Sequence, residues 1–316
     1  MSNLSIRSLV AFVGIPLLLS GAYVGGLFFF VLVLAISLLG LSEFHRIAES
    51  KGSFPNRPLG YLFGVGISLV FLHEECWVSF AETLAPSGIV IPLPSFAQSL
   101  AIIVILFVFS CIGLEVFRGK PSPLFNIGST LFGGLYVSLF LACLIGLRSI
   151  FQPAEFPVGS HFDSYGVDVL PSIREQIDVW GGRTVCSVFA SIWVCDSAAY
   201  FAGRAFGRKK LMVRVSPNKT WEGAVAGFIA ATATLILARE FWLPYLSMWH
   251  AVATGCIIGL FGQCGDLAES LLKRDAGIKD SSTLIPGHGG MLDRFDSLMF
   301  VSPILFLYYD FIVFAR

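Results

Sequence analysis

The chain has 316 residues, of which 55% are hydrophobic and only 13% are charged, with equal numbers of acidic and basic side chains. Because soluble domains carry about a quarter charged residues, this composition excludes an ordinary soluble protein. The zero formal net charge says nothing about partners, and we expect no nucleic-acid partner. A mean hydropathy of +0.79 indicates that the chain folds in a lipid bilayer, where α-helices satisfy the backbone internally.

Several apolar runs have the roughly 18 to 22 residues that cross about 30 Å of hydrocarbon as a helix. They predict an all-α, polytopic integral membrane protein with about nine transmembrane helices, and eight to ten as the range. A short Gly-containing bend separates the first two runs, so one combined span is an alternative. We find no internal repeat and expect a single integral membrane domain over residues 1–316. The predicted spans are 8–22, 25–43, 58–74, 98–116, 127–147, 184–203, 223–239, 247–265 and 297–314.

The distribution of Lys and Arg predicts an orientation, because cytoplasmic loops carry an excess of both. With nine spans and a cytoplasmic N-terminus, 16 of the 21 basic residues fall on the cytoplasmic side and five on the opposite side. This topology places the two most charged loops, 204–222 and 266–296, on the cytoplasmic face. Soluble nucleotides would therefore reach them.

The first candidate site residues lie in and after the span 184–203. Asp196 falls inside this span, where a carboxylate is costly and marks a functional site; pairing with a neighbouring polar group during helix assembly is the alternative. The loop that follows combines hydroxyl, amide and ammonium groups, which would suit phosphate, although it lacks Walker spacing. A basic loop that is merely solvated is the competing interpretation. The loop residues are Ser216, Asn218, Lys219 and Thr220.

The most charged segment, residues 266–296, holds six acidic and four basic residues and one histidine between two apolar spans. Asp266 begins it, and Asp293 and Asp296 end it. Since positions i and i+3 share a helix face, the last two carboxylates should point the same way. Three carboxylates at the membrane interface suit a hard cation such as Mg²⁺, which also bridges to phosphates. Solvated helix ends, or pairs with nearby basic groups, are the alternative.

Basic side chains lie among these acids, as a site for both a metal and a polyphosphate requires. They are Lys273, Arg274 and Lys279, with Asp280 adjacent; contact with anionic lipid headgroups is the alternative. The Gly-rich turn 286–290 cannot form a stable helix and lets backbone amides approach a ligand. His288 in this turn would bind phosphate or protonate a leaving group, and a plain loop is the alternative.

The spacing of these residues resembles the diagnostic motif of phosphatidate cytidylyltransferases, also called CDP-diacylglycerol synthases. The resemblance extends over about 196–297 and includes a 27-residue pattern in its last part. It rests on three strings. They are Asp196-Ser197-x-Ala199-Tyr200, then Ser216-Pro217-x-Lys219-Thr220-x-Glu222-Gly223, and finally Ser270-x-Leu272-Lys273-Arg274, Lys279-Asp280 and Pro286-x-His288-Gly289-Gly290-x-x-Asp293-Arg294-x-Asp296.

The resemblance implies a nucleotidyltransferase that moves the cytidylyl group of CTP to phosphatidic acid, giving CDP-diacylglycerol and pyrophosphate for phospholipid biosynthesis. It also implies Mg²⁺, with K⁺ as an optional second ion, in a multi-pass protein of the cell (inner) membrane. Residues 1–183 would hold the N-terminal spans and outer loops, and residues 184–316 the catalytic spans. The implied metal ligands are Asp266, Asp293 and Asp296; the implied catalytic residues are Lys273, Arg274, Lys279, Asp280, His288 and Arg294; and the implied substrate-binding residues are Asp196, Ser216, Asn218, Lys219, Thr220 and Ser270.

Three further points stay open at this stage. A transporter with a buried cation site would explain Asp196 and the nine spans, but not the charged string outside the membrane. A CTP-dependent lipid-alcohol kinase of related architecture would release CDP in place of pyrophosphate. Membrane lipids are expected partners, and a homodimer is an alternative to a single subunit.

Overall fold

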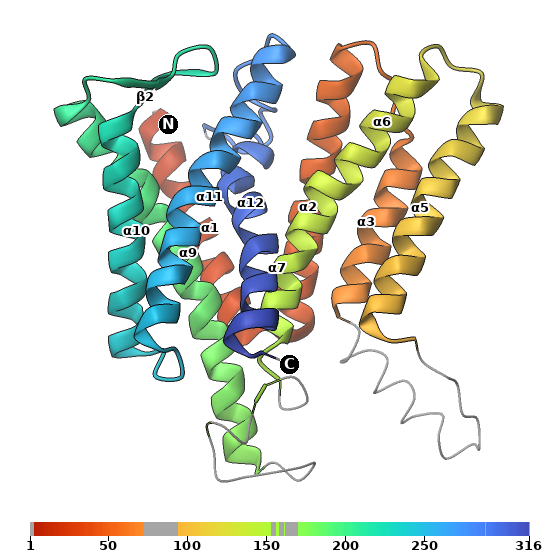
Figure 1. The fold of residues 1–316 in the computed structure, drawn as a ribbon. Coiled ribbons are helices and arrows are strands. Elements are labelled where there is room, and N and C mark those ends of the chain that lie inside the picture. The colour runs from red at the N-terminus through yellow and green to blue at the C-terminus, as the bar shows by residue number, and fades with distance from the viewer. Residues whose placement is uncertain are drawn as a thin grey trace, which may run out of the picture. The chain divides into compact units, whose positions relative to one another are not determined.

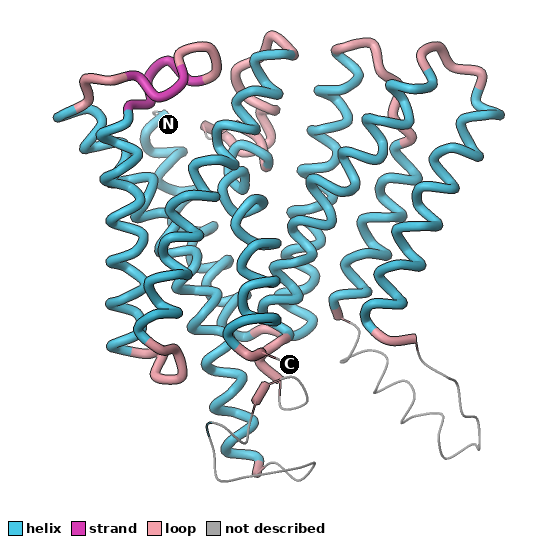
Figure 2. The backbone as a smooth tube through the Cα atoms, in the orientation of Figure 1, coloured by secondary structure: helices cyan, strands magenta, loops and turns pink. Residues whose placement is uncertain are grey.

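The computed structural model describes residues 3–72, 94–152, 156–157, 161, 170–287 and 289–315. Within these ranges the chain is helical, apart from loops and one two-stranded hairpin (Figures 1 and 2). The helices are α1 (Asn3–Val24), α2 (Gly26–Ser50), α3 (Arg57–Phe71), α5 (Phe96–Arg118), α6 (Pro123–Gly133), α7 (Phe140–Ser149), α9 (Pro171–Phe206), α10 (Trp221–Phe241), α11 (Met248–Asp275) and α12 (Leu292–Tyr308). Two π-helical segments, η3 (Gly134–Leu139) and η4 (Tyr309–Val313), continue α6 and α12, and the strands are β1 (Lys210–Met212) and β2 (Ser216–Thr220).

Each predicted span coincides with helix in the described residues, which confirms an all-α polytopic membrane fold. In the part of the chain that the structure describes, seven helical segments are long and apolar enough to cross a membrane, whereas α3 and the apolar part of α1 are shorter. The exact number of crossings therefore stays a prediction. The first two runs form separate helices. Gly25 between them and Gly26 at the start of α2 have positive φ values of 70° and 53°, a backbone conformation that ends a helix.

The chain divides into two compact units. One unit contains residues 1–29 and 147–316, and the other contains residues 30–146. All of the candidate site residues belong to the first unit. The predicted division at residue 183 separates the N-terminal spans from the catalytic spans by their expected roles and not by their contacts, and it stays a prediction.

In the first unit, α9 packs on α10, α10 on α11, and α11 on α12. The end of α9, the hairpin, the start of α10, the end of α11 and the start of α12 lie at the same end of this unit (Figure 1). The two charged loops predicted to share a face are thus neighbours. At the other end Arg148 is 5% exposed, donates to the carbonyl oxygens of Ala22 and Tyr23, and pairs with Asp178 at 2.6 Å. These bonds satisfy carbonyls that the end of α1 leaves open.

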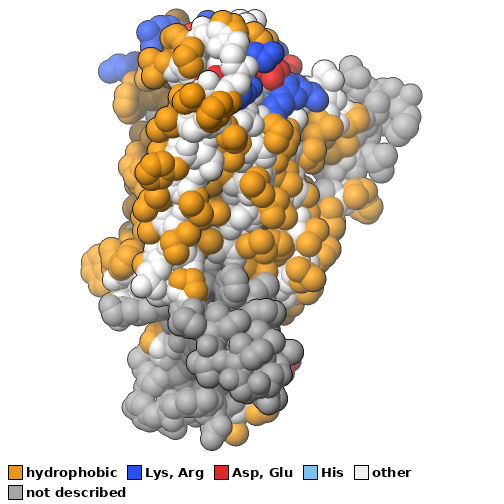
Figure 3. All heavy atoms as spheres, turned by 90° about the vertical axis from the view of Figure 1, so that its right-hand side faces the viewer, with side chains coloured by type: hydrophobic (Ala, Val, Ile, Leu, Met, Phe, Trp, Pro, Cys, Tyr) orange, Lys and Arg blue, Asp and Glu red, His pale blue; other side chains and the backbone are white. Residues whose placement is uncertain are grey.

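The second unit explains why the chain requires lipid. Its helix α5 exposes large apolar side chains along its length, including Ile105, Phe109 and Val116 at 53%, 71% and 74%. Figure 3 shows hydrophobic side chains covering the helices on this side, with Lys and Arg gathered at one end. An apolar surface of this extent is unfavourable in water and favourable against acyl chains. Inside the unit, Phe63 and Phe107 stack with ring centroids 3.9 Å apart.

Candidate active site

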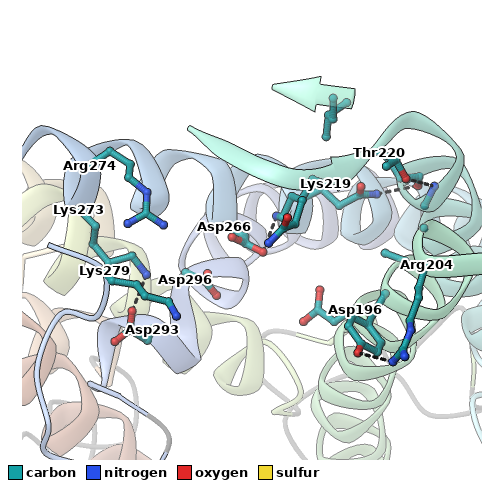
Figure 4. Close-up of a pocket in the computed structure, with 18 of the residues that line it drawn as sticks. Asp196, Arg204, Lys219, Thr220, Asp266, Lys273, Arg274, Lys279, Asp293 and Asp296 are labelled. Carbon is teal, nitrogen blue, oxygen red and sulfur yellow. Dashed lines mark hydrogen bonds and ion pairs between the residues drawn. The ribbon is translucent and has the colours of Figure 1, made fainter. Parts of the chain in front are cut away.

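A cavity of about 720 Å³ opens among α9, the hairpin, α10, α11, α12 and the loop between the last two helices (Figure 4). Asp196 lies ten residues before the end of α9, which is about 15 Å along a helix. The cavity therefore reaches from the charged end of the first unit well into its helices. Its lining residues are Asp196, Ala199, Tyr200, Gly203, Arg204, Leu211, Asn218, Lys219, Thr220, Gly223, Ala224, Gln263, Asp266, Lys273, Arg274, Lys279, Asp280, Asp293, Arg294 and Asp296.

The hairpin places Lys219 against the cavity. Strands β1 and β2 pair antiparallel, and Thr220 at the end of β2 caps α10 by accepting a hydrogen bond from the Gly223 amide at 3.2 Å. The Glu222 carboxylate accepts from the Lys209 amide at 3.2 and 3.3 Å, which holds the start of the hairpin to the first turn of α10. Held in this way, Lys219 brings its Nζ within 2.5 Å of Oδ2 of Asp266 on α11.

Helices α11 and α12 approach closely where their carboxylates enter the cavity. A Cβ atom on Gly265 would overlap the backbone carbonyl of Asp296, so only glycine permits this contact. The close approach brings Asp266 and Asp296 together, and Figure 4 shows both facing the cavity, with Asp196 of α9 across from them. Ser270 donates to Oδ1 of Asp266 at 3.3 Å, and Oδ1 of Asp296 accepts from the Ser297 amide at 2.7 Å.

Asp293 has a different environment from Asp296. Its Oδ1 pairs with Nζ of Lys273 at 2.5 Å. Its Oδ2 accepts from the amide and hydroxyl of Ser281, both at 2.9 Å, and from the Gly290 amide at 2.7 Å. Gly289 has φ of 86°, and a Cβ there would lie 2.6 Å from Oδ2 of Asp293. Asp293 therefore fastens the loop 276–291 to α12, and protein donors already surround its carboxylate.

Lys273 is also held internally. It is 8% exposed, and its Nζ lies 2.5 Å from Oε2 of Glu269 as well as from Asp293. Glu269 is 1% exposed and does not line the cavity. Contacts with two acidic side chains thus fix the position of Lys273. In contrast, no acidic side chain in the described part of the chain forms an ion pair with Lys279 or Arg294, and Arg274 donates only to the carbonyl of Ile278 at 3.0 Å.

The structure brings together most of the residues that the sequence nominated. Twelve of the fifteen line the one cavity. Ser270 does not line it but bonds to Asp266, and Ser216 lies at the start of β2 outside the lining. His288 lies outside the described residues, so its role stays a prediction.

Several lining or supporting residues were not nominated from the sequence. Arg204 and Tyr200 face the cavity from α9, where the guanidinium donates to the phenol oxygen at 3.3 Å. Arg204 lies four residues after Tyr200, as Lys273 does after Glu269. Side chains at this spacing share a helix face, so both pairs could have been recognised in the sequence. Gln263 lies one turn before Asp266, and an amide within an apolar span was the available signal.

The arrangement of carboxylates bears on the predicted metal site. Among the described residues, no three His, Cys, Asp or Glu side chains form a ready-made metal-binding group. Asp196 and Asp296 have no basic ion-pair partner in the same part of the chain, while Asp266 has Lys219. Two carboxylates without an ion-pair partner on one cavity wall are available to a cation. Mg²⁺ commonly takes only one or two carboxylates and completes its shell with water and phosphate oxygens, so this donor set fits it.

Comparisons with known proteins identify the family to which this sequence is similar. The sequence profile of the cytidylyltransferase family matches residues 5–312. A phosphatidate cytidylyltransferase of Staphylococcus epidermidis is 42% identical over 125 residues, which is 40% of this chain and 48% of that protein. One from Brucella melitensis is 44% identical over 138 residues, 43% and 50% of the two chains. One from Staphylococcus haemolyticus is 46% identical over 125 residues, 40% and 48%. The chain thus spans about half the length of the curated relatives it matches.

Proposed function

Because the chain belongs to the cytidylyltransferase family, we propose that it transfers the cytidylyl group of CTP to phosphatidic acid, releasing pyrophosphate. The observation that carries the proposal is a single cavity, lined by both carboxylates and basic groups, that runs from the charged end of the first unit into its apolar helices. Such a cavity suits a polyanionic nucleotide at its charged end and a lipid phosphate beside its apolar helices.

The basic residues divide into two groups by their partners. Lys279 and Arg294 have no ion-pair partner in the described part of the chain, and Arg274 bonds only to a backbone carbonyl. These three side chains are available to bind the triphosphate, and an arginine can bind phosphate in a bidentate manner. Lys219 and Lys273 already pair with acids. Lys273 therefore holds the loop in place, and Lys219 is available to phosphate only when it leaves Asp266.

We further propose that Asp266 and Asp296, with Asp196 opposite, bind Mg²⁺. When bound, the ion neutralises phosphate charge and stabilises the leaving pyrophosphate. The sequence grouped Asp293 with these ligands, but the four hydrogen bonds to its oxygens favour a positioning role. K⁺ as a second ion stays a prediction.

The reaction needs positioning more than acid–base chemistry. A phosphate oxygen of phosphatidic acid, already anionic at neutral pH, attacks the α-phosphorus of CTP. The bond from that phosphorus to the oxygen bridging to the β-phosphate breaks, and pyrophosphate leaves with the electron pair. Arg274, Lys279 and Arg294 hold the two anions together and offset the charge on the leaving group, which lowers the barrier by preorganised electrostatics.

The setting of the site is also part of the proposal. The excess of Lys and Arg at the cavity end supports a cytoplasmic orientation, in which CTP enters from the cytoplasm and the lipid from the bilayer. We place the protein in the inner membrane of the cell. A homodimer remains a prediction that cross-linking in membranes would address.

Turnover of the purified full chain tests this function. The protein in nanodiscs, given CTP, phosphatidic acid and Mg²⁺, should release one pyrophosphate for each CTP consumed, and only when the lipid is present. Release of CDP would indicate a lipid-alcohol kinase. Absence of any CTP consumption at every metal concentration would favour a transporter and refute the proposal.

A further inference from the structure

Gln263 on α11 has a fixed orientation at the cavity wall. Its Nε2 donates to the carbonyl oxygen of Gly259 at 2.7 Å and to that of Ala224 on α10 at 3.0 Å. Both neighbours are acceptors only, so the side-chain amide must turn its NH₂ group toward them. These two hydrogen bonds of the NH₂ group also fix the direction in which the opposite atom, Oε1, points.

This oxygen is a free acceptor. No group in the described ranges donates a hydrogen bond to Oε1 of Gln263. The atom is also not among the buried polar atoms that lack a partner, so it is accessible to solvent. Because the side chain lines the cavity, this acceptor belongs to the cavity and is available to a ligand that carries an N–H or O–H group.

The position of Gln263 selects the part of the ligand that it meets. Gln263 lies twelve residues before the end of α11, about 18 Å along the helix. Arg274 and Lys279, which suit the phosphates, lie at that end. Next to Gln263 the cavity is lined by small residues, Ala224 and its neighbour Gly223, which leave room for a flat ring. The uncharged base is the part of a nucleotide that loses least by lying so far from Arg274 and Lys279, because it has no charge for them to neutralise.

The chemistry of the two substrates indicates which ligand group donates to Oε1. Phosphatidic acid offers ester and phosphate oxygens, which are acceptors and are repelled by another carbonyl oxygen. Cytosine carries an amino group at position 4, which donates, whereas uracil carries an oxygen there. We propose that Oε1 of Gln263 accepts a hydrogen bond from the cytosine 4-amino group and makes the site prefer CTP to UTP. This inference rests on the proposed use of CTP.

The test compares the kcat/KM values of different nucleotides within one variant. A general loss of activity caused by the substitution therefore cancels in the ratio. Turnover of the full chain in nanodiscs is measured with CTP, with UTP, and with the ribonucleoside triphosphate of 2-pyrimidinone, which has hydrogen in place of the amino group. For the wild type, kcat/KM should be about tenfold higher for CTP than for the pyrimidinone, as one net hydrogen bond predicts. UTP, whose oxygen faces Oε1, should be worse by on the order of a hundredfold. In Gln263→Met, the CTP-to-pyrimidinone ratio should fall to about one.

A matched control is Cys256→Ala, which alters the contact of α11 with Thr232 on α10 outside the cavity lining. It should leave both ratios at their wild-type values even if it lowers thermal stability. Unchanged nucleotide ratios in Gln263→Met would overturn the inference, and so would a change confined to the ratio of CTP to dCTP, which would assign the contact to the ribose. Equilibrium binding of the same nucleotides without lipid measures the same ratios, so the inference is decided even if turnover with phosphatidic acid fails.

Discussion

The substitutions Asp293→Asn and Asp296→Asn should have different effects, although the two residues lie three apart on one helix. Asp293 accepts four hydrogen bonds, one of them from the buried Lys273. Asparagine keeps one acceptor oxygen but turns an NH₂ group toward existing donors. The lost charge-assisted bond and the unsatisfied donors should cost about 2–4 kcal/mol. The larger penalty of a fully broken buried pair does not apply, because Glu269 still faces Lys273.

Asp296→Asn should have the opposite pattern. Asp296 has no basic partner in the described ranges, and the Ser297 amide can still donate to an asparagine oxygen. Stability should therefore change by less than about 1 kcal/mol. If Asp296 binds Mg²⁺, turnover should fall by about 10²–10³, and the Mg²⁺ concentration for half-maximal rate should rise.

Thermal unfolding in detergent and Mg²⁺ titration of turnover separate the two roles. Asp293→Asn should lower Tm by roughly 5–10 °C, with its residual activity keeping the wild-type Mg²⁺ requirement. Asp296→Asn should keep its Tm and need a higher Mg²⁺ concentration for its half-maximal rate. Glu240→Gln, on an exposed pair far from the lining, is the control and should change neither. A stable Asp293→Asn with a raised Mg²⁺ requirement would refute the positioning role and return Asp293 to the metal ligands.

Three further predictions concern the same cavity. Gly265→Ala should force α11 from α12, lower stability by about 1–3 kcal/mol and lower turnover; a variant with wild-type Tm and rate would show that the contact is not needed. The double variant Lys279→Gln, Arg294→Gln should raise KM for CTP by about tenfold or more at unchanged Tm, since both cations are free of acidic partners; steady-state kinetics at constant lipid would reveal an unchanged KM if they do not bind nucleotide. Removal of divalent ions with EDTA should stop turnover reversibly, with Mg²⁺ restoring it, and full activity in EDTA would contradict the metal proposal.

Some of this site was readable from the sequence because its signals are local. Hydropathy located the helices, and the i, i+3 spacing predicted one helix face for Asp293 and Asp296, which both line the cavity. Hydropathy also predicted that the apolar part of α11 ends at Asp266, although the helix itself continues to Asp275. A helix need not end where its apolar run ends, because the polar residues after Asp266 are good helix formers.

Other features depend on contacts between distant segments. Lys219 and Asp266 are 47 positions apart, and nothing local indicates that they pair. The partners of Asp293 come from a loop whose path requires the positive φ of Gly289. Spacing could therefore not distinguish a carboxylate surrounded by protein donors from one that faces an open cavity. The orientation of the Gln263 amide likewise depends on a carbonyl from another helix.

The path of the phosphorus atoms tests the central proposal most directly. Purified protein in nanodiscs containing phosphatidic acid is given CTP labelled with ³²P at either the α or the γ position. Cytidylyl transfer predicts that the α label appears in the lipid and the γ label in pyrophosphate, with Mg²⁺ required for both. Transfer of the γ label to the lipid, or no labelled lipid with either nucleotide, would contradict it.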